Sequence, residues 1–497
     1  MQENLNQKIT QATKWSSVTE IIVKLISPIT NSILARILMP EAFGVVATLT
    51  MVVSFAEIFT DAGFQKYLVQ REFRDGEDLN ISTNVAFWTN LALSLFIWAG
   101  IACFATPIAN AVGSSGCESA IIAMCIQIPL LAFSSIQRAR YRRDFAFKTL
   151  FTVRVTTALV PLVVTVPLAM IFRSYWALVF GTLARDFLNA IILTVRSKWK
   201  PKFEYSIAKL KEMLSFSIWT VVENISIWLT AYVGPFVVGN LLNAYYLGLY
   251  KTTISTTGAY LGLITAATTP VMFSALSRCQ NDDLQFRDVF FRFQRMVSLL
   301  LFPLGCGLCV YRELVTKILL GSQWMEAADF IGMWSLSSVI SIVFSYYNSE
   351  VFRSKGKPML SVLTQVLHLI VLVPVLIWSA KKGFTFLTIA RTLVRLHMIL
   401  TSCLVLRFAI GIRFTSIVKN VWPPMVSAGI MLLVGMAIRT VYPNVLWELV
   451  TVLVCVLVYA AVMLAIPAGR RQLAEIPVLR KIFRLKTVSD IDTKDKQ

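Results

Sequence analysis

Long apolar segments recur along the whole chain and are separated by short polar stretches. Many of them approach the ~20 residues that an α-helix needs to span a bilayer. The sequence lacks the ~10-residue alternating segments that would indicate a membrane β-barrel. The pattern therefore predicts an all-α polytopic membrane protein with about fourteen transmembrane helices. The expected ranges are 15–38, 41–62, 81–105, 118–137, 149–172, 174–195, 212–238, 244–272, 288–311, 327–348, 359–379, 384–407, 421–441 and 446–467.

Composition supports this class. Hydrophobic residues make up 56% of the chain and charged residues 15%, with a mean hydropathy of +0.68. The net charge of +20 would suggest nucleic acid binding in a soluble protein, but here the basic residues sit in short loops, so we expect no nucleic-acid partner. The first apolar segment is too long for a signal peptide, so no cleavable signal is expected. The eight cysteines form no CxxC or Cys/His cluster, which argues against a metal site and a disulfide framework.

The charges of the loops predict the orientation of the chain. When the expected helices are numbered in order, the loops after even-numbered helices carry 22 Lys and Arg residues, and the loops after odd-numbered helices carry 6. Loops rich in Lys and Arg stay on the cytoplasmic side of a membrane. We therefore expect both termini to be cytoplasmic.

Two stretches of the chain resemble each other. ARILMPEAFGVV (35–46) and GNLLNAYYLGLY (239–250) each read as a helix end, a tight turn and a helix start, with Gly44 matching Gly248. An even number of helices per repeat gives both halves one orientation, with a substrate site expected between them. The predicted parts are an N-lobe (1–195), a basic cytoplasmic linker (196–211), a C-lobe (212–408), two further helices (409–467) and a cytoplasmic tail (468–497), so the fold would hold two pseudo-symmetric six-helix lobes plus two C-terminal helices.

The first helix carries a polar stripe. A charge inside a bilayer is costly unless it faces protein or water, so such residues are functional candidates. Glu20, Lys24 and Asn31 share one side of this helix. Lys24 either faces a central cavity and attracts an anionic substrate, or forms a structural pair with Glu20. Arg36 lies off the stripe and is expected to snorkel to the membrane interface.

Further charges lie in the other helices of the first half. Glu57 and Asp61 share a face of the second helix, where they either couple transport to an ion or form gating salt bridges. Arg154 lies near one end of the fifth helix, so snorkelling is an alternative to a cavity position. Arg185 and Asp186 lie deep in the sixth helix, where a functional role is harder to dismiss.

The second half carries its own intramembrane charges. Glu223 lies in the seventh helix and Lys251 lies early in the eighth. Arg391 and Arg395 share a face of the twelfth helix, which demands an anionic partner or water. His368, in the eleventh helix, is expected to be a satisfied packing residue.

Cations outnumber anions among these residues, which suits a phosphate-bearing or otherwise anionic cargo. The basic, aromatic loops 138–148 and 198–211 either reflect topology and interfacial anchoring or capture phosphate headgroups. The expected substrate-binding residues are Lys24, Lys251, Arg154, Arg185, Arg391 and Arg395. The expected gating or ion-coupling residues are Glu20, Glu57, Asp61, Asp186, Glu223 and Asn31.

Several motifs resemble the bacterial polysaccharide transporter family, which includes the Wzx-type flippases, particularly the colanic-acid-type branch. They are LARILMPEAFG (34–44), FTDAGF (59–64), VQRE (69–72), FWTNL (87–91) and QRARYRRDFAFK (137–148). This family belongs to the superfamily of the multidrug and toxin extruders and the lipid II flippase MurJ. The resemblance implies fourteen helices in two six-helix lobes and an alternating-access mechanism. It also implies that Lys24 and Lys251 meet the pyrophosphate of the cargo.

The resemblance implies a flippase for undecaprenyl-pyrophosphate-linked oligosaccharides in the bacterial inner membrane. Expected partners are membrane lipids, a polysaccharide polymerase and glycosyltransferases. We expect no catalytic residues, no cofactor and no metal, with H⁺ or Na⁺ as possible coupling ions. The chain has no P-loop for direct use of ATP. The alternatives are a small-molecule antiporter of the same superfamily and a membrane glycosyltransferase or polysaccharide polymerase.

Overall fold

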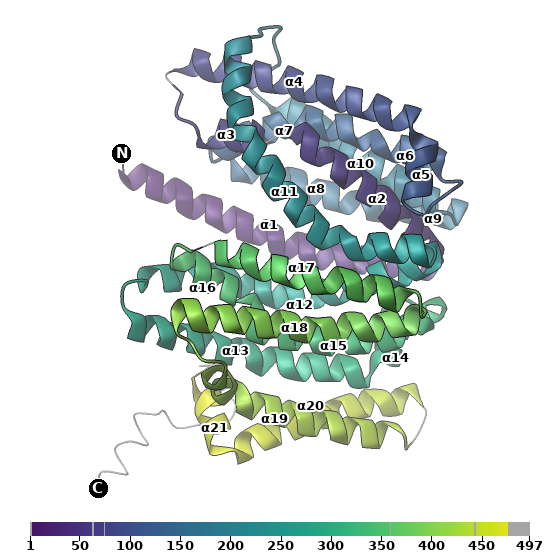
Figure 1. Cartoon of the computed structure of the whole chain (residues 1–497), viewed down its shortest axis with the longest axis vertical. Coiled ribbons are helices and arrows are strands. Elements are labelled where there is room, and N and C mark those ends of the chain that lie inside the picture. The colour runs from purple at the N-terminus through teal and green to yellow at the C-terminus, as the bar shows by residue number, and fades with distance from the viewer. Residues whose placement is uncertain (1, 62–63, 74, 358, 442–443, 476–497) are drawn as a thin grey trace. The chain divides into compact units, whose positions relative to one another are not determined.

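All regular secondary structure in the described residues is helical. The structure is a computed structural model. It describes residues 2–61, 64–73, 75–357, 359–441 and 444–475. It describes the backbone but not the side chains of residues 2–14, 16–17, 21, 61, 70, 215–220, 222–223, 270 and 445. The first helices are α1 (Gln2–Ile37), α2 (Pro40–Asp61), α3 (Phe64–Gln70), α4 (Gly76–Cys103), α5 (Ala105–Ala111), α6 (Glu118–Cys125), α7 (Gln127–Arg143), α8 (Phe147–Val160), the π-helical turn η1 (Pro161–Thr165), α9 (Val166–Phe172), α10 (Tyr175–Arg196), α11 (Ile207–Leu241) and α12 (Ala244–Arg278). They are followed by α13 (Asp283–Val310), α14 (Arg312–Leu319), η2 (Ser322–Ala327), α15 (Ala328–Ser341), η3 (Ile342–Tyr346), α16 (Asn348–Ser354), α17 (Met359–Ala380), α18 (Phe384–Ile410), α19 (Phe414–Arg439), α20 (Val445–Ala465) and α21 (Pro467–Ala474) (Figure 1).

The prediction of a polytopic helical membrane protein is confirmed. Within the described residues, thirteen helical stretches are long and apolar enough to cross a membrane. The remaining predicted segment, 212–238, lies inside α11. Several predicted boundaries were wrong. The helix expected to begin at 421 begins as α19 at Phe414, and the helix expected to end at 137 continues as α7 to Arg143. Arginine is a good helix former, and cations are favoured in the last turn of a helix, so this basic stretch extends the helix instead of forming a loop.

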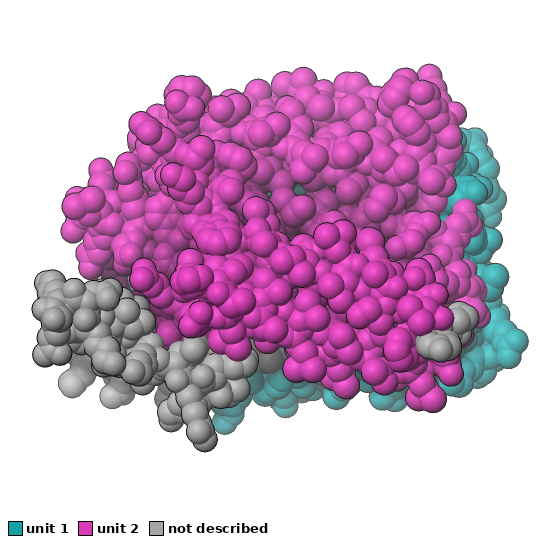
Figure 2. Space-filling view, turned by 90° about the horizontal axis from the view of Figure 1, so that it is seen from below, with its two compact units in different colours: residues 1–252 teal, residues 253–497 magenta. Residues whose placement is uncertain are grey.

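The chain divides into two compact units, residues 1–252 and 253–497. They are coloured separately in Figure 2. α11 packs against α2, α3 and α4, and so belongs to the first unit, although the sequence analysis assigns 212–238 to the C-lobe. The predicted lobe boundaries therefore stay a prediction. A large apolar cluster in unit 2 extends from α12 to α20.

The repeated hairpin has the same helix ends in both copies. α1 ends at Ile37 and α2 begins at Pro40; α11 ends at Leu241 and α12 begins at Ala244, each 204 positions later. The two hairpins also contact each other reciprocally, since a Cβ on Gly44 would lie 1.7 Å from the carbonyl oxygen of Ala244, and a Cβ on Gly248 would lie 1.9 Å from that of Pro40. A reciprocal contact of this kind is what a two-fold relation between the copies requires. Glycine at both positions lets the backbones meet.

The order of the other elements repeats as well. A short helix follows the third long helix of each half: α5 follows α4, and α14 follows α13. The next span begins at Glu118 in the first half and at Ser322 in the second, again 204 positions apart. α19 and α20 follow the two repeats in the chain and pack side by side (Figure 1). The predicted architecture of two six-helix repeats plus two C-terminal helices thus has its counterpart in the order of the elements.

The basic linker between α10 and α11 lies along α4. The amide nitrogen of Asn84 donates a hydrogen bond of 3.0 Å to Glu204, and the indole of Trp88 donates one of 2.8 Å to the carbonyl oxygen of Lys202. The Trp88 ring also stacks on Phe203 at 4.4 Å between ring centroids. These contacts fix the linker to unit 1.

Candidate functional site

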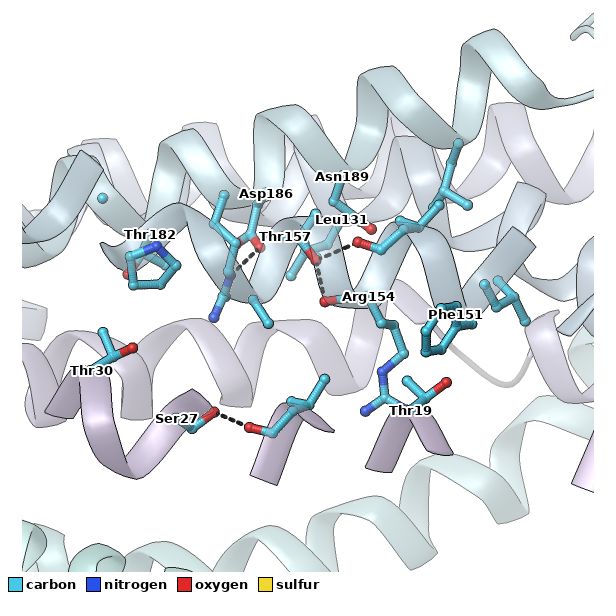
Figure 3. Close-up of a pocket in the computed structure, with 18 of the residues that line it drawn as sticks. Thr19, Ser27, Thr30, Leu131, Phe151, Arg154, Thr157, Thr182, Asp186 and Asn189 are labelled. Carbon is cyan, nitrogen blue, oxygen red and sulfur yellow. Dashed lines mark hydrogen bonds and ion pairs between the residues drawn. The ribbon is translucent and has the colours of Figure 1, made fainter. Parts of the chain in front are cut away.

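A cavity of about 970 Å³ lies within unit 1, between α1, α7, α8, η1 and α10. Each helix contributes residues at helical spacing. Thr19, Ser27 and Thr30 of α1 face Thr182 and Asp186 of α10 across the cavity (Figure 3). Because threonine, serine and asparagine side chains line much of it, the cavity is polar although the surrounding helices are apolar enough to span a membrane.

A break in the fifth span shapes one wall of this cavity. The chain leaves the α-helical pattern at Pro161 and forms η1, as proline lacks the N–H that the α-helical ladder needs. A Cβ on Gly181 would lie 1.9 Å from Oγ1 of Thr165, so a glycine is required where α10 approaches η1. Pi-helical turns of this kind are frequent at functional sites.

Positive charge predominates in the cavity. Among the described residues, four arginines line it: Arg138 and Arg142 from α7, Arg154 from α8 and Arg185 from α10. The described carboxylates that line it are those of Glu20 and Asp186. An apolar environment strengthens electrostatic interactions, so an excess of guanidinium groups over carboxylates makes the cavity attractive for an anion.

The Arg154–Glu20 pair joins α8 to α1. Nη1 of Arg154 donates to Oε1 of Glu20 at 2.5 Å. The two side chains are 52% and 43% exposed, respectively. Exposed ion pairs contribute only about 0–1 kcal/mol, so an anionic ligand could displace Glu20 from Arg154 at little cost. The sequence analysis left a Glu20–Lys24 pair as one of two alternatives for Lys24; the structure shows Glu20 paired with Arg154.

The Arg185–Asp186 pair is less exposed. Nε of Arg185 donates to Oδ1 of Asp186 at 3.0 Å, and the Asp186 side chain is 6% exposed. Asn189, one turn later, donates a hydrogen bond of 3.3 Å to Ser134 of α7. The guanidinium of Arg185 is 41% exposed, so it can reach a ligand while Asp186 holds it in place.

A smaller cavity of about 280 Å³ adjoins the first, since both are lined by Leu131 and Arg138. Glu57 of α2 lines it together with Asn90 of α4 and Asn224 of α11. The predicted gating residue Glu57 therefore lies beside the arginine-lined cavity. The side chains of Asp61 and Glu223, the other predicted acidic carriers, lie outside the described residues.

The remaining predicted residues of unit 1 occupy different places. Asn31 lines the large cavity. Lys24 is half-buried on α1 and is not among the residues that line either described cavity. Lys251 is half-buried on α12, with Nζ 5.0 Å from the ring centroid of Tyr232 on α11. Tyr232 in turn stacks on Trp228.

Arg391 and Arg395 lie in unit 2, on α18. Their guanidinium carbons lie 5.0 and 3.5 Å from the ring centroid of Trp334 on α15. Arg395 also donates a hydrogen bond to Ser338. The expectation that the two arginines share a face is thus met, and one aromatic ring holds both.

The sequence analysis missed Arg138 and Arg142 as cavity residues. It placed them in a cytoplasmic loop because they belong to a run of basic residues. The sequence does contain a signal for their position on the cavity side of the helix, because Arg138 and Arg142 follow Leu131 by seven and eleven residues. At about 100° per residue, these intervals bring all three side chains to one side of a helix.

A family model described as "Polysaccharide biosynthesis protein" matches residues 33–329. The chain belongs to this family. Among its relatives, the succinoglycan biosynthesis transport protein ExoT of Rhizobium meliloti (strain 1021) is 26% identical over 68% of this chain and 68% of its own. The lipopolysaccharide biosynthesis protein WzxC of Escherichia coli (strain K12) is 19% identical over 85% of both chains.

A solved structure of the lipid II flippase MurJ in an inward closed conformation has the same fold. It superposes with a TM-score of 0.73 over 90% of this chain and 97% of its own, at 13% identity. At that identity the likeness concerns the fold alone. The two repeats of helices in this chain therefore follow an architecture already seen in a membrane flippase.

Proposed function

We propose that this chain is a flippase that moves an undecaprenyl-pyrophosphate-linked oligosaccharide across the bacterial inner membrane for surface polysaccharide synthesis. The observation that carries the proposal is the polar cavity of unit 1, which four arginines and two carboxylates of the described residues line. A pyrophosphate is a dense anion that arginine binds well. The printed functions of ExoT and WzxC, in polysaccharide transport and synthesis, agree with such a cargo.

The flippase works by alternating access. With the cavity open to the cytoplasm, Arg138, Arg142, Arg154 and Arg185 attract the pyrophosphate, and the polar side chains of the cavity contact the sugars. The lipid tail stays in the bilayer. Closure of one side and opening of the other moves the headgroup without exposing its charge to hydrocarbon, where desolvation would be costly. The protein forms and breaks no covalent bond in this mechanism and acts as a transporter, not as an enzyme.

The ion that drives the cycle is part of the proposal. Glu57 lies beside Arg138 in the smaller cavity, so protonation or Na⁺ binding there would change the charge next to the arginines. Asp61 and Glu223 stay predicted carriers. Lys24, Lys251, Arg391 and Arg395 stay predicted contacts of the cargo in other states of the cycle. Both termini are placed in the cytoplasm on the basis of loop charge alone.

One experiment distinguishes the proposed flippase from a drug antiporter and from a polysaccharide polymerase. The purified chain is reconstituted in liposomes that contain a fluorescent lipid-linked oligosaccharide, and the accessibility of the sugar to an external enzyme reports flipping. Arg142→Gln and Arg154→Gln are expected to reduce the rate at least tenfold, whereas Lys198→Gln, in the linker outside the cavity, is expected to leave it unchanged. A drug antiporter would transport small cations and leave the lipid in place. A polymerase would lengthen the oligosaccharide.

A further inference from the structure

The linker between α10 and α11 has a buried side and an exposed basic side. Ser197 follows α10 in an extended conformation, with φ −69° and ψ 127°. From there the side chains alternate, because Ser197 and Trp199 are buried whereas their neighbours in the chain are exposed. Successive side chains of an extended chain point to opposite sides. The exposed side carries four cations, which are Arg196 at the end of α10 and Lys198, Lys200 and Lys202 of the linker.

Side chains of α4 hold the linker in this conformation. Oδ1 of Asn84 accepts a hydrogen bond of 3.2 Å from the backbone N–H of Lys202. The hydroxyl oxygens of Thr89 and Tyr205 lie 2.8 Å apart and share a hydrogen bond. The contacts of Trp88 with the linker lie between these two points of attachment. Because the backbone is fixed on one side, the cations stay on the other.

Acidic side chains do not neutralise this row of cations. Among the described residues, none of the four forms an ion pair with a carboxylate. Glu204, the acidic residue of the linker, accepts a hydrogen bond from Asn84 instead. Lys209, at the start of α11, differs from them, since it pairs with Asp78 and lies 4.0 Å from Glu212. The charge of the row is therefore available to an anion outside the protein.

Two exposed aromatic side chains follow the cations. The side chain of Phe203 is 91% exposed and that of Tyr205 is 51% exposed. The Phe203 ring stacks on Trp88 of α4, and the exposed Leu95, seven residues further along α4, lies on the same side of that helix. α4 is long and apolar enough to cross a membrane, so its exposed apolar side is suited to lipid contact. Phe203 extends this apolar side to the linker.

Cations beside exposed aromatic rings match the chemistry of a membrane surface. Lysine and arginine side chains are attracted to anionic lipid headgroups, and aromatic rings prefer the level of the headgroups. A soluble anion would bind the cations but would leave the ring of Phe203 in water, where apolar surface is unfavourable. The combination favours an anionic lipid over a soluble anion.

We propose that residues 196–205 form a docking surface for anionic phospholipids of the membrane leaflet that the linker faces. Arg196, Lys198 and Lys202 contact the headgroups, and the ring of Phe203 lies among the upper parts of the acyl chains. The contacts with α4 arrange this surface in advance, so binding needs little further ordering of the chain. The lipid bound here is a component of the membrane and not the cargo, and the site does not rest on the proposed function.

The test is photo-crosslinking of the full-length chain in liposomes. Trace amounts of phosphatidylglycerol or phosphatidylcholine carry the same photoreactive acyl chain, and mass spectrometry measures the labelling of the peptide that contains Phe203 and Tyr205. Wild type is expected to be labelled about fivefold or more in favour of phosphatidylglycerol, since each cation near an anionic headgroup contributes to the attraction. The double variant Lys198→Gln with Lys202→Gln is expected to lose this preference, whereas Lys198→Arg with Lys202→Arg keeps it.

The matched control is Lys381→Gln with Lys382→Gln, which removes the same charge from another loop and is expected to keep the preference of wild type. Phe203→Ser is expected to lower labelling by both lipids, whereas Phe203→Leu, which stays apolar but cannot stack on Trp88, keeps it. All of the changed linker side chains are exposed, so the variants are expected to fold.

The proposal is overturned if the two lipids label wild type equally, or if the Gln variant keeps the preference. It is also overturned if inorganic pyrophosphate at constant ionic strength abolishes the preference, because the site would then bind a soluble anion. Since this labelling needs no transport, failure of the flippase hypothesis leaves the result unaffected.

Discussion

The reciprocal contact between the two hairpins makes Gly44 the most sensitive glycine of the repeat. In Gly44→Ala the new Cβ would lie 1.7 Å from the carbonyl oxygen of Ala244, whereas real Cβ contacts stay above 3.0 Å. The start of α2 must therefore move away from α12 by more than 1 Å. Overpacking a tight core typically costs about 1–3 kcal/mol, and a backbone atom cannot rotate aside, so we expect a loss near the upper end of that range.

The assay is thermal unfolding of the purified chain in detergent. A loss of about 3 kcal/mol in a unit of this size corresponds to a fall in the apparent midpoint of roughly 6–12 °C. Gly248→Ala is expected to produce a similar fall, because its Cβ would meet Pro40 in the mirrored contact. The matched control is Gly258→Ala on α12, where no atom lies within 4 Å of the new Cβ, so it should be neutral or slightly stabilising. A Gly44→Ala midpoint within 1 °C of wild type, or a Gly248→Ala variant as stable as the control, would refute the reasoning.

Three further predictions concern single contacts. Arg154→Gln should leave the unfolding midpoint within about 2 °C of wild type, since exposed ion pairs stabilise by only about 0–1 kcal/mol; a large fall would show that the pair with Glu20 is structural. Trp88→Leu should release the linker and speed tryptic cleavage after Lys202 at least fivefold on gels, and an unchanged rate would contradict the role given to the Trp88 contacts. Tyr232→Leu should lower the flipping rate more than Tyr232→Phe does, because phenylalanine keeps an aromatic ring next to Lys251. Equal rates for the two variants would show that flipping does not depend on the cation–π contact.

The sequence predicted the fold well because the bilayer imposes a strong constraint. Every backbone polar group inside hydrocarbon must be satisfied within the segment, so long apolar runs become helices. The repeat was visible because a close helix crossing requires glycine, and Gly44 and Gly248 are kept at the same position of both hairpins. The helix ends at these two hairpins follow the same interval of 204 positions.

The site was predicted less completely because it depends on which helix faces which. Arg154, Arg185 and Asp186 were found because charges inside apolar segments are conspicuous. Arg138 and Arg142 were hidden in a basic stretch that the charge rule reads as a loop. Glu20 and Ser27 of the predicted polar stripe line the cavity of unit 1, whereas the position of Lys24 in a central cavity stays a prediction.

The two arginines of α18 show a second limit. A tryptophan such as Trp334 is indistinguishable in sequence from any other core residue, and only the packing of α15 against α18 brings it to the arginines. His368 was expected to be a satisfied packing residue. It is indeed buried, but Nδ1 has no partner among the described residues, and hydrogen bonding between helices cannot be read from one helix alone.

The central claim is translocation of a pyrophosphate-linked sugar lipid. The most direct measurement follows the wild-type chain in liposomes that carry either an undecaprenyl-pyrophosphate-linked oligosaccharide or the same sugar on a neutral lipid without the pyrophosphate. The account predicts rapid flipping of the first lipid and at least tenfold slower flipping of the second, because the arginines of the cavity act on the phosphate. Equal rates for the two lipids, or no flipping of either beyond protein-free liposomes, would contradict it.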